Sequence, residues 1–532
     1  MVVPERAPRP EAATVESTSP PARSRRAGVL IPLFSVRTNR SWGCGDIGDI
    51  PKFAAWAAKS GLSVLQLLPV NEVTGADASP YAAASAFALD PVYLSIDDCE
   101  DFAAAGGLRA LPPEHREELE SLRNSPIVQW PRVRRLKEAA AHLAFQRFLR
   151  DECKKKTRRA QALNAFQMEQ RSWLDDHLLF SVIHERLKKS WLDWPEALRL
   201  RTPEGIAGLR REFSELLLEK AWLQWQLDLQ WRKARDEASD LGVSLMGDLP
   251  FTVASDSADV WANPKVFRPD LHVGTPPDDF AAEGQDWGLP AYDWNQLRRS
   301  EFAWIRARAA RASVLFSGYR VDHVIGLYRT YVRNTTDGQS SFWPAHEAAQ
   351  IALGETLIRI MRTTAEVIAE DLGTVPPFLR PSLDRLSVPG YRVLRWEKDN
   401  GGFRDPATYP KLSVATNGTH DTDTTADWYD GLAADERALL TKVPGLETLA
   451  DQPRFTDKVR DAVLAVLYRS PAQLVIEPFQ HLLGHRDRVN VPGTVSDSNW
   501  SYRMPLTVED LEKDAATSER LARLAQEYSR HR

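Results

Sequence analysis

Eight short runs rich in Val, Ile and Leu recur along the chain, and several of them lack a strict alternation of polar and apolar positions. This pattern is typical of strands that are covered on both faces, as in parallel sheets. We therefore predict eight buried strands. They are Gly28–Val36, Ser63–Val70, Val243–Leu249, Gly318–Val324, Glu366–Leu372, Tyr391–Trp396, Leu412–Asn417 and Gln473–Glu477.

Helical periodicity occupies most of the intervals between these runs. Alternating strands and helices predict parallel βαβ units, and eight such units predict an α/β fold closed into a (β/α)8 TIM barrel. The predicted helices are Ile50–Ser60, Glu219–Leu241, Glu301–Ser313, Ala345–Thr363 and Lys458–Arg469.

One interval is far longer than an ordinary connection between a strand and a helix. About 170 residues separate the second and third predicted strands, whereas such connections usually take about two to six. Within this interval Leu218, Trp222, Trp225 and Leu229 form one apolar stripe, which favours core packing over a ligand site. We predict a large, mostly helical insertion subdomain at about residues 97–240. Further loop insertions are predicted at the barrel mouth, among them a lid loop at about residues 274–289.

Composition narrows the possible partners. The 532 residues include 68 basic and 73 acidic side chains, which gives a net charge of −5. This balance provides no basic excess for a nucleic-acid backbone and no polybasic tail for a membrane surface. No apolar stretch approaches the roughly 20 residues of a membrane span. The three cysteines are scattered and fit neither a disulfide framework nor a metal site, which favours a cytoplasmic location.

The N-terminal segment, residues 1–27, is rich in Pro, Arg, Ser and Ala and lacks the apolar stretch of a signal peptide. We interpret it as a disordered tail, so that a single catalytic domain spans residues 28–532. Gly43–Gly48 has the spacing of dinucleotide-binding glycines, but Arg37–Trp42 separates it from the preceding strand, which favours a tight loop at the barrel rim. The 11 histidines show no metal-ligand spacing, and no metal site is predicted.

Three acidic residues follow apolar runs in the C-terminal half: Asp322 in Gly-Tyr-Arg-Val-Asp-His, Glu370 in Val-Ile-Ala-Glu, and Asp421 in Asn-Gly-Thr-His-Asp. We interpret each as standing at a strand end. In a parallel barrel those ends converge on one mouth, where catalytic groups gather. Carboxylates that converge repel one another unless a reaction or a cation requires them. The arrangement suggests chemistry on glycosidic bonds, although each acid alone is as well explained by a turn cap, a helix cap or a surface cation.

Retaining glycosidic chemistry needs an ionised carboxylate as nucleophile and a protonated carboxyl about 5–5.5 Å away. Arg320 and Asp322 lie two positions apart on a strand, so their side chains point the same way and the guanidinium favours the ionised carboxylate. Asp322 is therefore the predicted nucleophile. Glu370 follows three apolar residues, where burial and neighbouring carboxylates are expected to raise its pKa, which suits an acid/base.

The acidic residues beside this pair receive different interpretations. Asp371 is expected to point to the opposite side of the strand from Glu370 and to serve structure. Asp421, which follows His420, is expected to hold substrate hydroxyls while the sugar ring distorts.

A larger set of motifs resembles one enzyme family. In order along the chain they are Ser79–Tyr81, Ser85–Phe87, Met246–Phe251, Asp256–Trp261, Gly274–Phe280, Gly284–Gly288, Arg320–His323, Ala369–Gly373, Gly418–Asp421, Arg488–Thr494 and Asn499–Trp500. Together they cover about Gly28 to Arg503. The combination resembles the amylomaltases, the 4-α-glucanotransferases of glycoside hydrolase family 77 in the α-amylase clan.

The resemblance implies a barrel with insertions and a double displacement on α-1,4-glucans. Asp322 would attack the anomeric carbon while Glu370 protonates the leaving oxygen, and Glu370 would then deprotonate the 4-hydroxyl of the acceptor. The expected partners are maltooligosaccharides, glucans derived from starch or glycogen, and glucose as acceptor, with no metal and no organic cofactor. The implied substrate-binding residues are Tyr81, Asp248, Gln285, Trp287, Arg320, His420, Asp421 and Asn490.

The sequence differs from the motifs of related enzymes at two places. Asp279 and Phe280 stand where many amylomaltases carry a tyrosine in the lid loop. Asp248 leads into Leu-Pro-Phe and not the Asn-His of α-amylases, which fits amylomaltase. Two alternatives stay open: an α-1,4-glucan hydrolase of the same clan, and a non-catalytic glucan-binding protein that binds maltooligosaccharides without changing their chain lengths.

Overall fold

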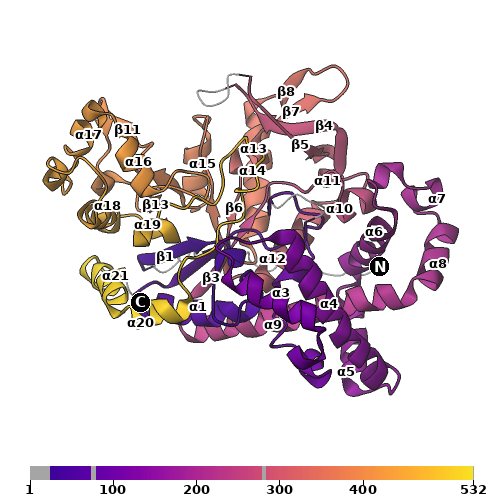
Figure 1. Ribbon diagram of the computed structural model, residues 1–532. Coiled ribbons are helices and arrows are strands. Elements are labelled where there is room, and N and C mark those ends of the chain that lie inside the picture. The colour runs from indigo at the N-terminus through magenta and orange to yellow at the C-terminus, as the bar shows by residue number, and fades with distance from the viewer. Residues whose placement is uncertain (1–23, 74–78, 278–282, 531–532) are drawn as a thin grey trace, which may run out of the picture.

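A closed barrel of eight parallel strands forms the centre of the computed structural model, which describes residues 24–73, 79–277 and 283–530 (Figure 1). Neighbouring barrel strands follow one another in the chain, and the last pairs with the first, with Gly28 opposite Ile476. All eight predicted strands are confirmed. Their bounds are β1 Arg26–Ile31, β2 Val64–Leu67, β3 Ser244–Leu249, β6 Gly318–Val321, β9 Glu366–Ala369, β10 Gly390–Val393, β13 Ser413–Thr416 and β14 Leu474–Pro478.

The boundaries of β1 differ from the prediction at both ends. The strand begins at Arg26 and Ala27 is fully buried, so the predicted tail, residues 1–27, reaches into the barrel. Residues 1–23 of that tail lie outside the described residues. The strand ends at Ile31 because Pro32 has no N–H to donate and a 3-10 turn follows it.

Helices cover the outside of the barrel, and each predicted helix is confirmed with shifted ends. Trp231 of α9 donates its indole N–H to the carbonyl of Leu315 in α12 at 2.6 Å, which joins two neighbouring covering helices. The helices are α1 Ile50–Lys59, α9 Ser214–Asp240, α12 Ala303–Leu315, α14 Glu347–Arg362 and α18 Asp457–Arg469. Within the described residues, no helix combines the length and apolarity needed to cross a bilayer.

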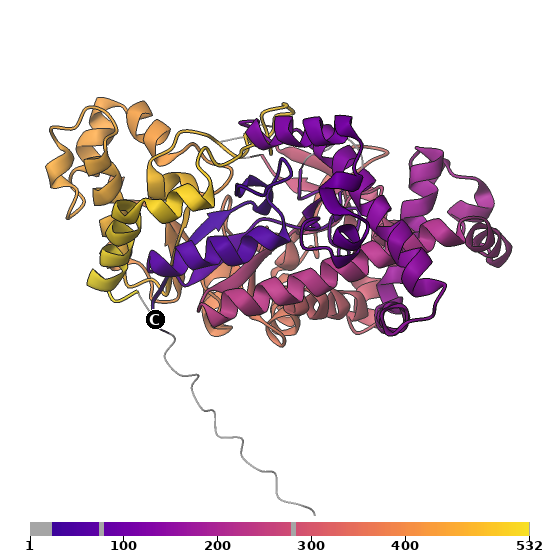
Figure 2. The ribbon, with the colours of Figure 1, turned by 60° about the horizontal axis from the view of Figure 1, so that its bottom comes forward.

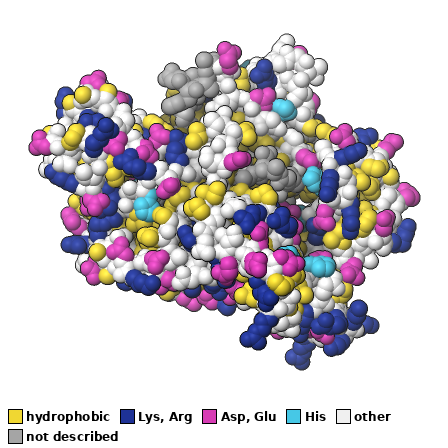
Figure 3. All heavy atoms as spheres, in the orientation of Figure 1, with side chains coloured by type: hydrophobic (Ala, Val, Ile, Leu, Met, Phe, Trp, Pro, Cys, Tyr) yellow, Lys and Arg dark blue, Asp and Glu magenta, His cyan; other side chains and the backbone are white. Residues whose placement is uncertain are grey.

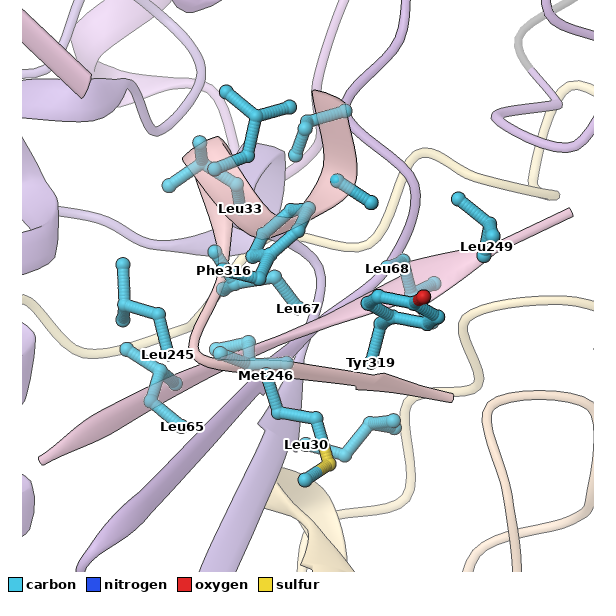
Figure 4. Close-up of a cluster of buried hydrophobic side chains, with 14 of the residues drawn as sticks. Leu30, Leu33, Leu65, Leu67, Leu68, Leu245, Met246, Leu249, Phe316 and Tyr319 are labelled. Atoms are coloured by element: carbon cyan, nitrogen blue, oxygen red, sulfur yellow. The ribbon is translucent and has the colours of Figure 1, made fainter. Parts of the chain in front are cut away.

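Apolar side chains from several strands pack together in the core (Figure 4). Leu245 and Met246 of β3 lie near Phe316 and Tyr319 in this cluster, and all four are buried. Gly247 lies against the ring of Phe316, where an added Cβ would come within 2.4 Å of a ring carbon. Only glycine fits at this position, and the close approach fixes the strand immediately before Asp248.

The long interval between β2 and β3 is helical, as predicted, and projects to one side of the barrel (Figures 1 and 2). Trp222 and Trp225 of α9 pack against Phe148, so the predicted core role holds for them, whereas Leu229 of the same stripe is 47% exposed. The inserted helices before α9 are α2 Glu100–Ala104, α3 Pro113–Asn124, α4 Trp130–Phe148, α5 Arg158–Glu169, α6 Arg171–Leu187, α7 Glu196–Arg199 and α8 Pro203–Glu212.

A second sheet, which the sequence pattern did not predict, stands at the barrel mouth (Figure 1). It is antiparallel, in the order β5-β4-β7-β8, with β4 Phe267–Thr275, β5 Gln285–Tyr292, β7 Thr330–Asn334 and β8 Ser340–Trp343. Within the described residues, the predicted lid loop comprises the end of β4, the first part of β5 and the residues directly beside them. Asp279 and Phe280 lie outside the described residues.

Shorter elements complete the chain. The C-terminal helices α20 and α21 pack against α1, and Figure 2 shows them beside it. Charged side chains of both signs are interspersed over the face in Figure 3, in keeping with the nearly balanced charge. The remaining elements are α10 Ala258–Ala262, α11 Trp294–Arg299, α13 Val324–Tyr328, α15 Leu379–Arg385, β11 Lys398–Asp399, β12 Gly402–Phe403, α16 Thr425–Gly431, α17 Ala434–Leu440, α19 Phe479–Leu483, α20 Val508–Lys513 and α21 Ala515–Glu527.

The glycine-rich segment Gly43–Gly48 forms a tight turn, which agrees with the predicted rim loop. Asp46 accepts a hydrogen bond from the N–H of Gly48 at 3.1 Å and caps the 3-10 turn. The buried ammonium of Lys137 lies 3.0 Å from the Asp46 carboxylate. Cys44, close by, is buried and unpaired, as is Cys99, and Cys153 is also unpaired.

Candidate active site

One buried arginine binds two carboxylates at the mouth of the barrel. Asp248 near the end of β3 stands opposite Arg320 of β6, and Asp322 directly follows that strand. Nη1 of Arg320 lies 2.8 Å from both carboxylate oxygens of Asp248 and 2.8 Å from Oδ1 of Asp322. The hydroxyl of Tyr81, from the loop after β2, donates to Asp248 Oδ2 at 2.8 Å. These contacts join three segments that are distant in sequence.

The ion pair is almost fully removed from water, since the Arg320 side chain is 6% exposed and that of Asp248 is 0% exposed. Burial disfavours the charged guanidinium, but the carboxylates of Asp248 and Asp322 outweigh it and raise the pKa of Arg320 well above its usual range. Arg320 therefore stays charged. Removing Arg320 would be costly, because the fully buried carboxylate of Asp248 would then be left unpaired.

Glu370 directly follows β9 and is nearly buried, with 9% of its surface exposed. Oε2 accepts a hydrogen bond from the backbone N–H of His323 at 2.7 Å, and Oε1 accepts one from Leu372 at 3.2 Å. Burial raises the pKa of Glu370 to about 8; the charge of Asp322 adds to this effect and Arg320 opposes it. Glu370 therefore holds its proton at neutral pH, as the sequence predicted.

Asp371 points away from this cluster and binds the backbone of the next strand, in agreement with its predicted structural role. Its carboxylate accepts the N–H of Tyr391 in β10 at 2.6 Å. Arg380 and Arg392 lie 3.0 Å and 3.3 Å from the same carboxylate, which is 1% exposed. Two adjacent acids thus serve opposite sides of one strand end, because side chains alternate along extended backbone.

Asp421 differs from the prediction in its place on the backbone. The strand β13 ends at Thr416, so Asp421 lies in the loop beyond it and not at the strand end. The amide of Asn490 donates to Asp421 Oδ1 at 2.7 Å, and Nε2 of His420 lies 3.3 Å from Oδ2. Contacts with another loop therefore fix this carboxylate.

Aromatic contacts link further residues to the cluster, at His420 and at His323. The ring of Tyr81 stacks on that of His420, with centroids 5.3 Å apart and an interplanar angle of 12°. On the other side, Trp287 of β5 directs its ring against His323 at 4.9 Å and donates its indole N–H to Gln285 Oε1 at 3.0 Å. All the predicted site residues therefore belong to one connected cluster at the barrel mouth.

Three residues of the cluster were not chosen from the sequence. His323 contacts Glu370 through its backbone, and Phe251 packs against the His323 ring at 5.7 Å. The ring centroid of Trp500 lies 5.8 Å from that of Tyr81 and 5.9 Å from that of His420. All three stand inside motifs quoted above, but a lone histidine or aromatic residue carries no signal that separates a site residue from core packing. In the part of the chain that is described, no group of three or more His, Cys, Asp or Glu could hold a metal ion.

A parallel barrel with an arginine-bound aspartate and a proton-holding glutamate at its mouth defines an enzyme that acts on glycosidic bonds. A sequence model of the family described as 4-alpha-glucanotransferase matches residues 31–507, and the chain belongs to this family.

Relatives from distant organisms cover nearly the whole chain. The 4-alpha-glucanotransferase of Chlamydia pneumoniae is 30% identical over 509 residues, which is 92% of this chain and 93% of the relative. That of Thermus thermophilus is 32% identical over 494 residues, covering 87% and 92%. The chloroplastic/amyloplastic 4-alpha-glucanotransferase of Solanum tuberosum is 30% identical over 516 residues, covering 91% and 83%.

Two solved structures share the fold. The amylomaltase from Streptococcus agalactiae in complex with acarbose superposes with a TM-score of 0.82 at 24% identity and covers 96% of this chain and 100% of that one. The amylomaltase from Corynebacterium glutamicum gives a TM-score of 0.77 at 24% identity and covers 94% and 75%. The overall fold is therefore shared with these two amylomaltases.

Proposed function

We propose that this protein is a 4-α-glucanotransferase that moves a segment of an α-1,4-glucan to the 4-hydroxyl of another glucan or of glucose, with retention of configuration. One observation carries the proposal: in a chain of this family, Arg320 binds Asp322 while the neighbouring Glu370 is buried and protonated at neutral pH. A retaining mechanism requires a carboxylate nucleophile beside a second carboxyl group that holds its proton.

The proposed reaction has two displacements. In the first, a carboxylate oxygen of Asp322 forms a bond to the anomeric carbon, the glycosidic bond breaks, and the proton of Glu370 passes to the leaving oxygen. In the second, the 4-hydroxyl of the acceptor gives its proton to Glu370 and its oxygen attacks the anomeric carbon, while the bond to Asp322 breaks. Both proton transfers and the covalent step use side chains of this chain alone.

The remaining residues of the cluster are proposed to bind sugars. Asp248, Arg320, His420 and Asp421 present charged and polar groups beside the two carboxyls, which suits the donor sugar at the cleavage point. Around them we propose neighbouring subsites lined by Tyr81, Gln285, Trp287 and Asn490. Aromatic faces such as that of Trp287 suit the apolar face of a sugar ring.

The β4–β5 hairpin is proposed to act as the lid that favours an acceptor sugar over water. Gln285 and Trp287 stand on this hairpin and reach the cluster through His323. Excluding water from a covalent intermediate prevents its hydrolysis. We further propose one catalytic domain that begins with β1 at Arg26, rather than at residue 28, and extends to residue 532, with the helical insertion at about 97–240. The scattered cysteines support a cytoplasmic location.

Activity is expected to fall as pH rises through about 8. In the free enzyme, kcat/KM for a maltooligosaccharide donor depends on the protonated form of Glu370, whose pKa burial raises to about 8. Below this pH the acid form predominates, so loss of this proton does not limit the rate. A profile of kcat/KM across roughly pH 6 to 10 checks the expectation. An alkaline limb within the ordinary carboxyl range, below roughly pH 5, would contradict it.

Maltotriose alone, incubated with the purified protein, tests the function. We expect glucose together with a ladder of chains longer than maltotriose, resolved by chromatography, because each transferred segment lengthens an acceptor. Glucose and maltose without longer chains would identify a hydrolase. Binding of maltooligosaccharides by calorimetry, with no change in chain length even for longer donors, would identify a glucan-binding protein.

A further inference from the structure

His323 has a backbone conformation that residues other than glycine rarely adopt. Its φ is +46°, in the left-handed region, at the junction between β6 and α13. In this turn the N–H of His323 donates to Glu370 Oε2 at 2.7 Å. The residue that follows the proposed nucleophile therefore holds the proposed acid/base through its main chain.

The ring of His323 is held from two sides. Trp287 contacts it edge-on with ring centroids 4.9 Å apart, and Phe251 does so at 5.7 Å. Gly326, in the first turn of α13, leaves room for the ring, since a Cβ there would come within 2.7 Å of His323 Cδ2. Trp287 and Phe251 thus hold a side chain whose own backbone is strained, and strain of this kind persists only where the surroundings enforce it.

We propose that His323 is a positioning residue for Glu370: Trp287 and Phe251 hold its ring, its left-handed turn sets the backbone, and its N–H orients the Glu370 carboxyl. The inference rests on the proposed function, in which Glu370 transfers the proton. It extends that function by linking the β4–β5 hairpin, through Trp287, to the orientation of the acid/base.

The link acts by orientation and not by charge on the imidazole. Burial lowers the pKa of His323 to about 4, so the ring is neutral in the working range. Besides the backbone N–H groups of His323 and Leu372, the titratable groups near Glu370 are Arg320, Asp322 and Tyr391. The carboxylate of Asp371 points away and acts on Glu370 only through its charge. The N–H of His323 favours the ionised carboxylate, so loosening it is expected to move the alkaline limb of kcat/KM to higher pH.

The test compares His323→Ala with His323→Asn. Alanine disfavours the left-handed turn and removes the ring, whereas asparagine adopts that turn more readily. We expect His323→Ala to lower kcat on maltotriose about 10- to 100-fold, because a small misplacement of a catalytic group costs up to about that much. His323→Asn should lose less. His142→Ala, at a 58% exposed histidine of the insertion, is the matched control and should leave rate and pH profile unchanged.

A second donor separates positioning from structure. With α-maltotriosyl fluoride, the C–F bond breaks as Asp322 bonds to the anomeric carbon, and fluoride departs without a proton from Glu370. Azide then attacks that carbon as the Asp322 bond breaks, and it needs no deprotonation. With this fluoride and azide, both His323 variants are expected to react nearly as fast as the unmodified protein does with the same two compounds. With maltotriose, the alkaline limb of kcat/KM for both variants should move to higher pH.

Several outcomes would overturn the proposal. An equal loss with maltotriose and with the fluoride would mean that His323 supports folding or donor binding. Full activity of His323→Ala would mean that its backbone does not orient Glu370. If His323→Ala does not fold, His323→Asn decides by the same ratio of rates. Glu370→Gln, measured alongside, must also recover with fluoride and azide; if it does not, the acid/base assignment itself fails, independently of His323.

Discussion

An Asp322→Asn variant is expected to lose about 10⁴- to 10⁶-fold in kcat for glucan disproportionation, the scale of loss when a covalent nucleophile is removed. The amide nitrogen and oxygen of asparagine lack the charge needed to form the glycosyl ester. Arg320 keeps its contacts with both oxygens of Asp248 at 2.8 Å, so the barrel mouth is expected to stay assembled. The loss should therefore lie in the chemical step.

Two measurements check this expectation. Incubation with α-maltotriosyl fluoride followed by mass spectrometry should find no glycosyl adduct on the variant, and its thermal unfolding midpoint should match that of the unmodified protein. Asp435→Asn, at an exposed aspartate of α17, is the matched control and should keep full activity. An Asp322→Asn enzyme with ordinary rates would show that another residue is the nucleophile.

Glu370→Gln is expected to lower kcat on maltotriose by about 10²- to 10⁴-fold, the usual contribution of general acid–base catalysis. Glutamine can still accept the N–H of His323 but has no proton to give to the leaving oxygen. With α-maltotriosyl fluoride the first displacement should proceed, and a glycosyl ester on Asp322 should accumulate because no base activates the acceptor. A peptide carrying three hexose units at Asp322 would be the direct readout.

The pH profile supplies an independent check of the same variant. The alkaline limb near pH 8 should disappear, because that limb belongs to the pKa of Glu370 and glutamine does not titrate. Glu120→Gln, on α3 with its side chain 65% exposed, should keep both the rate and the limb. A limb that persists in Glu370→Gln would assign it to another group.

Both predictions depend on one feature of the site, which is that two neighbouring carboxyl groups have different surroundings. Asp322 is 24% exposed and bound to a guanidinium, while Glu370 is nearly buried and bound to backbone N–H groups. Burial favours the protonated form of Glu370, and the backbone N–H of His323 opposes that effect. The same arginine that holds Asp322 also opposes the raised pKa of Glu370, so Arg320 influences both proposed displacements.

The barrel and much of the site could be predicted because their signals are local. A strand that is covered on both faces needs a short apolar run, and each of the eight runs carries that requirement within a few residues. Once the strands form a parallel barrel, geometry brings their carboxyl ends together, so Asp322 and Glu370 must meet. The side-chain alternation that separates Glu370 from Asp371 follows from the extended backbone alone.

Other features depend on contacts between distant segments, which leave no local pattern. The antiparallel sheet pairs β4 with β7, although β5, β6 and the helices α11, α12 and α13 lie between these two strands in the chain. The loop of Asp421 is set by Asn490, and the stacking of Tyr81 on His420 joins loops from opposite ends of the chain. The pattern near Asp421 therefore predicted a strand end where the structure has a loop.

The sequence by itself determined the eight-stranded barrel, the family likeness and the identity of the carboxyl groups, because apolar runs and short motifs act over a few residues. Only the tertiary structure decided how the site is held: the left-handed turn of His323, its ring between Trp287 and Phe251, and the backbone N–H groups that bind the Glu370 carboxyl. Burial and electrostatic interaction depend on which atoms come close in space, and that proximity exists only after the chain has folded.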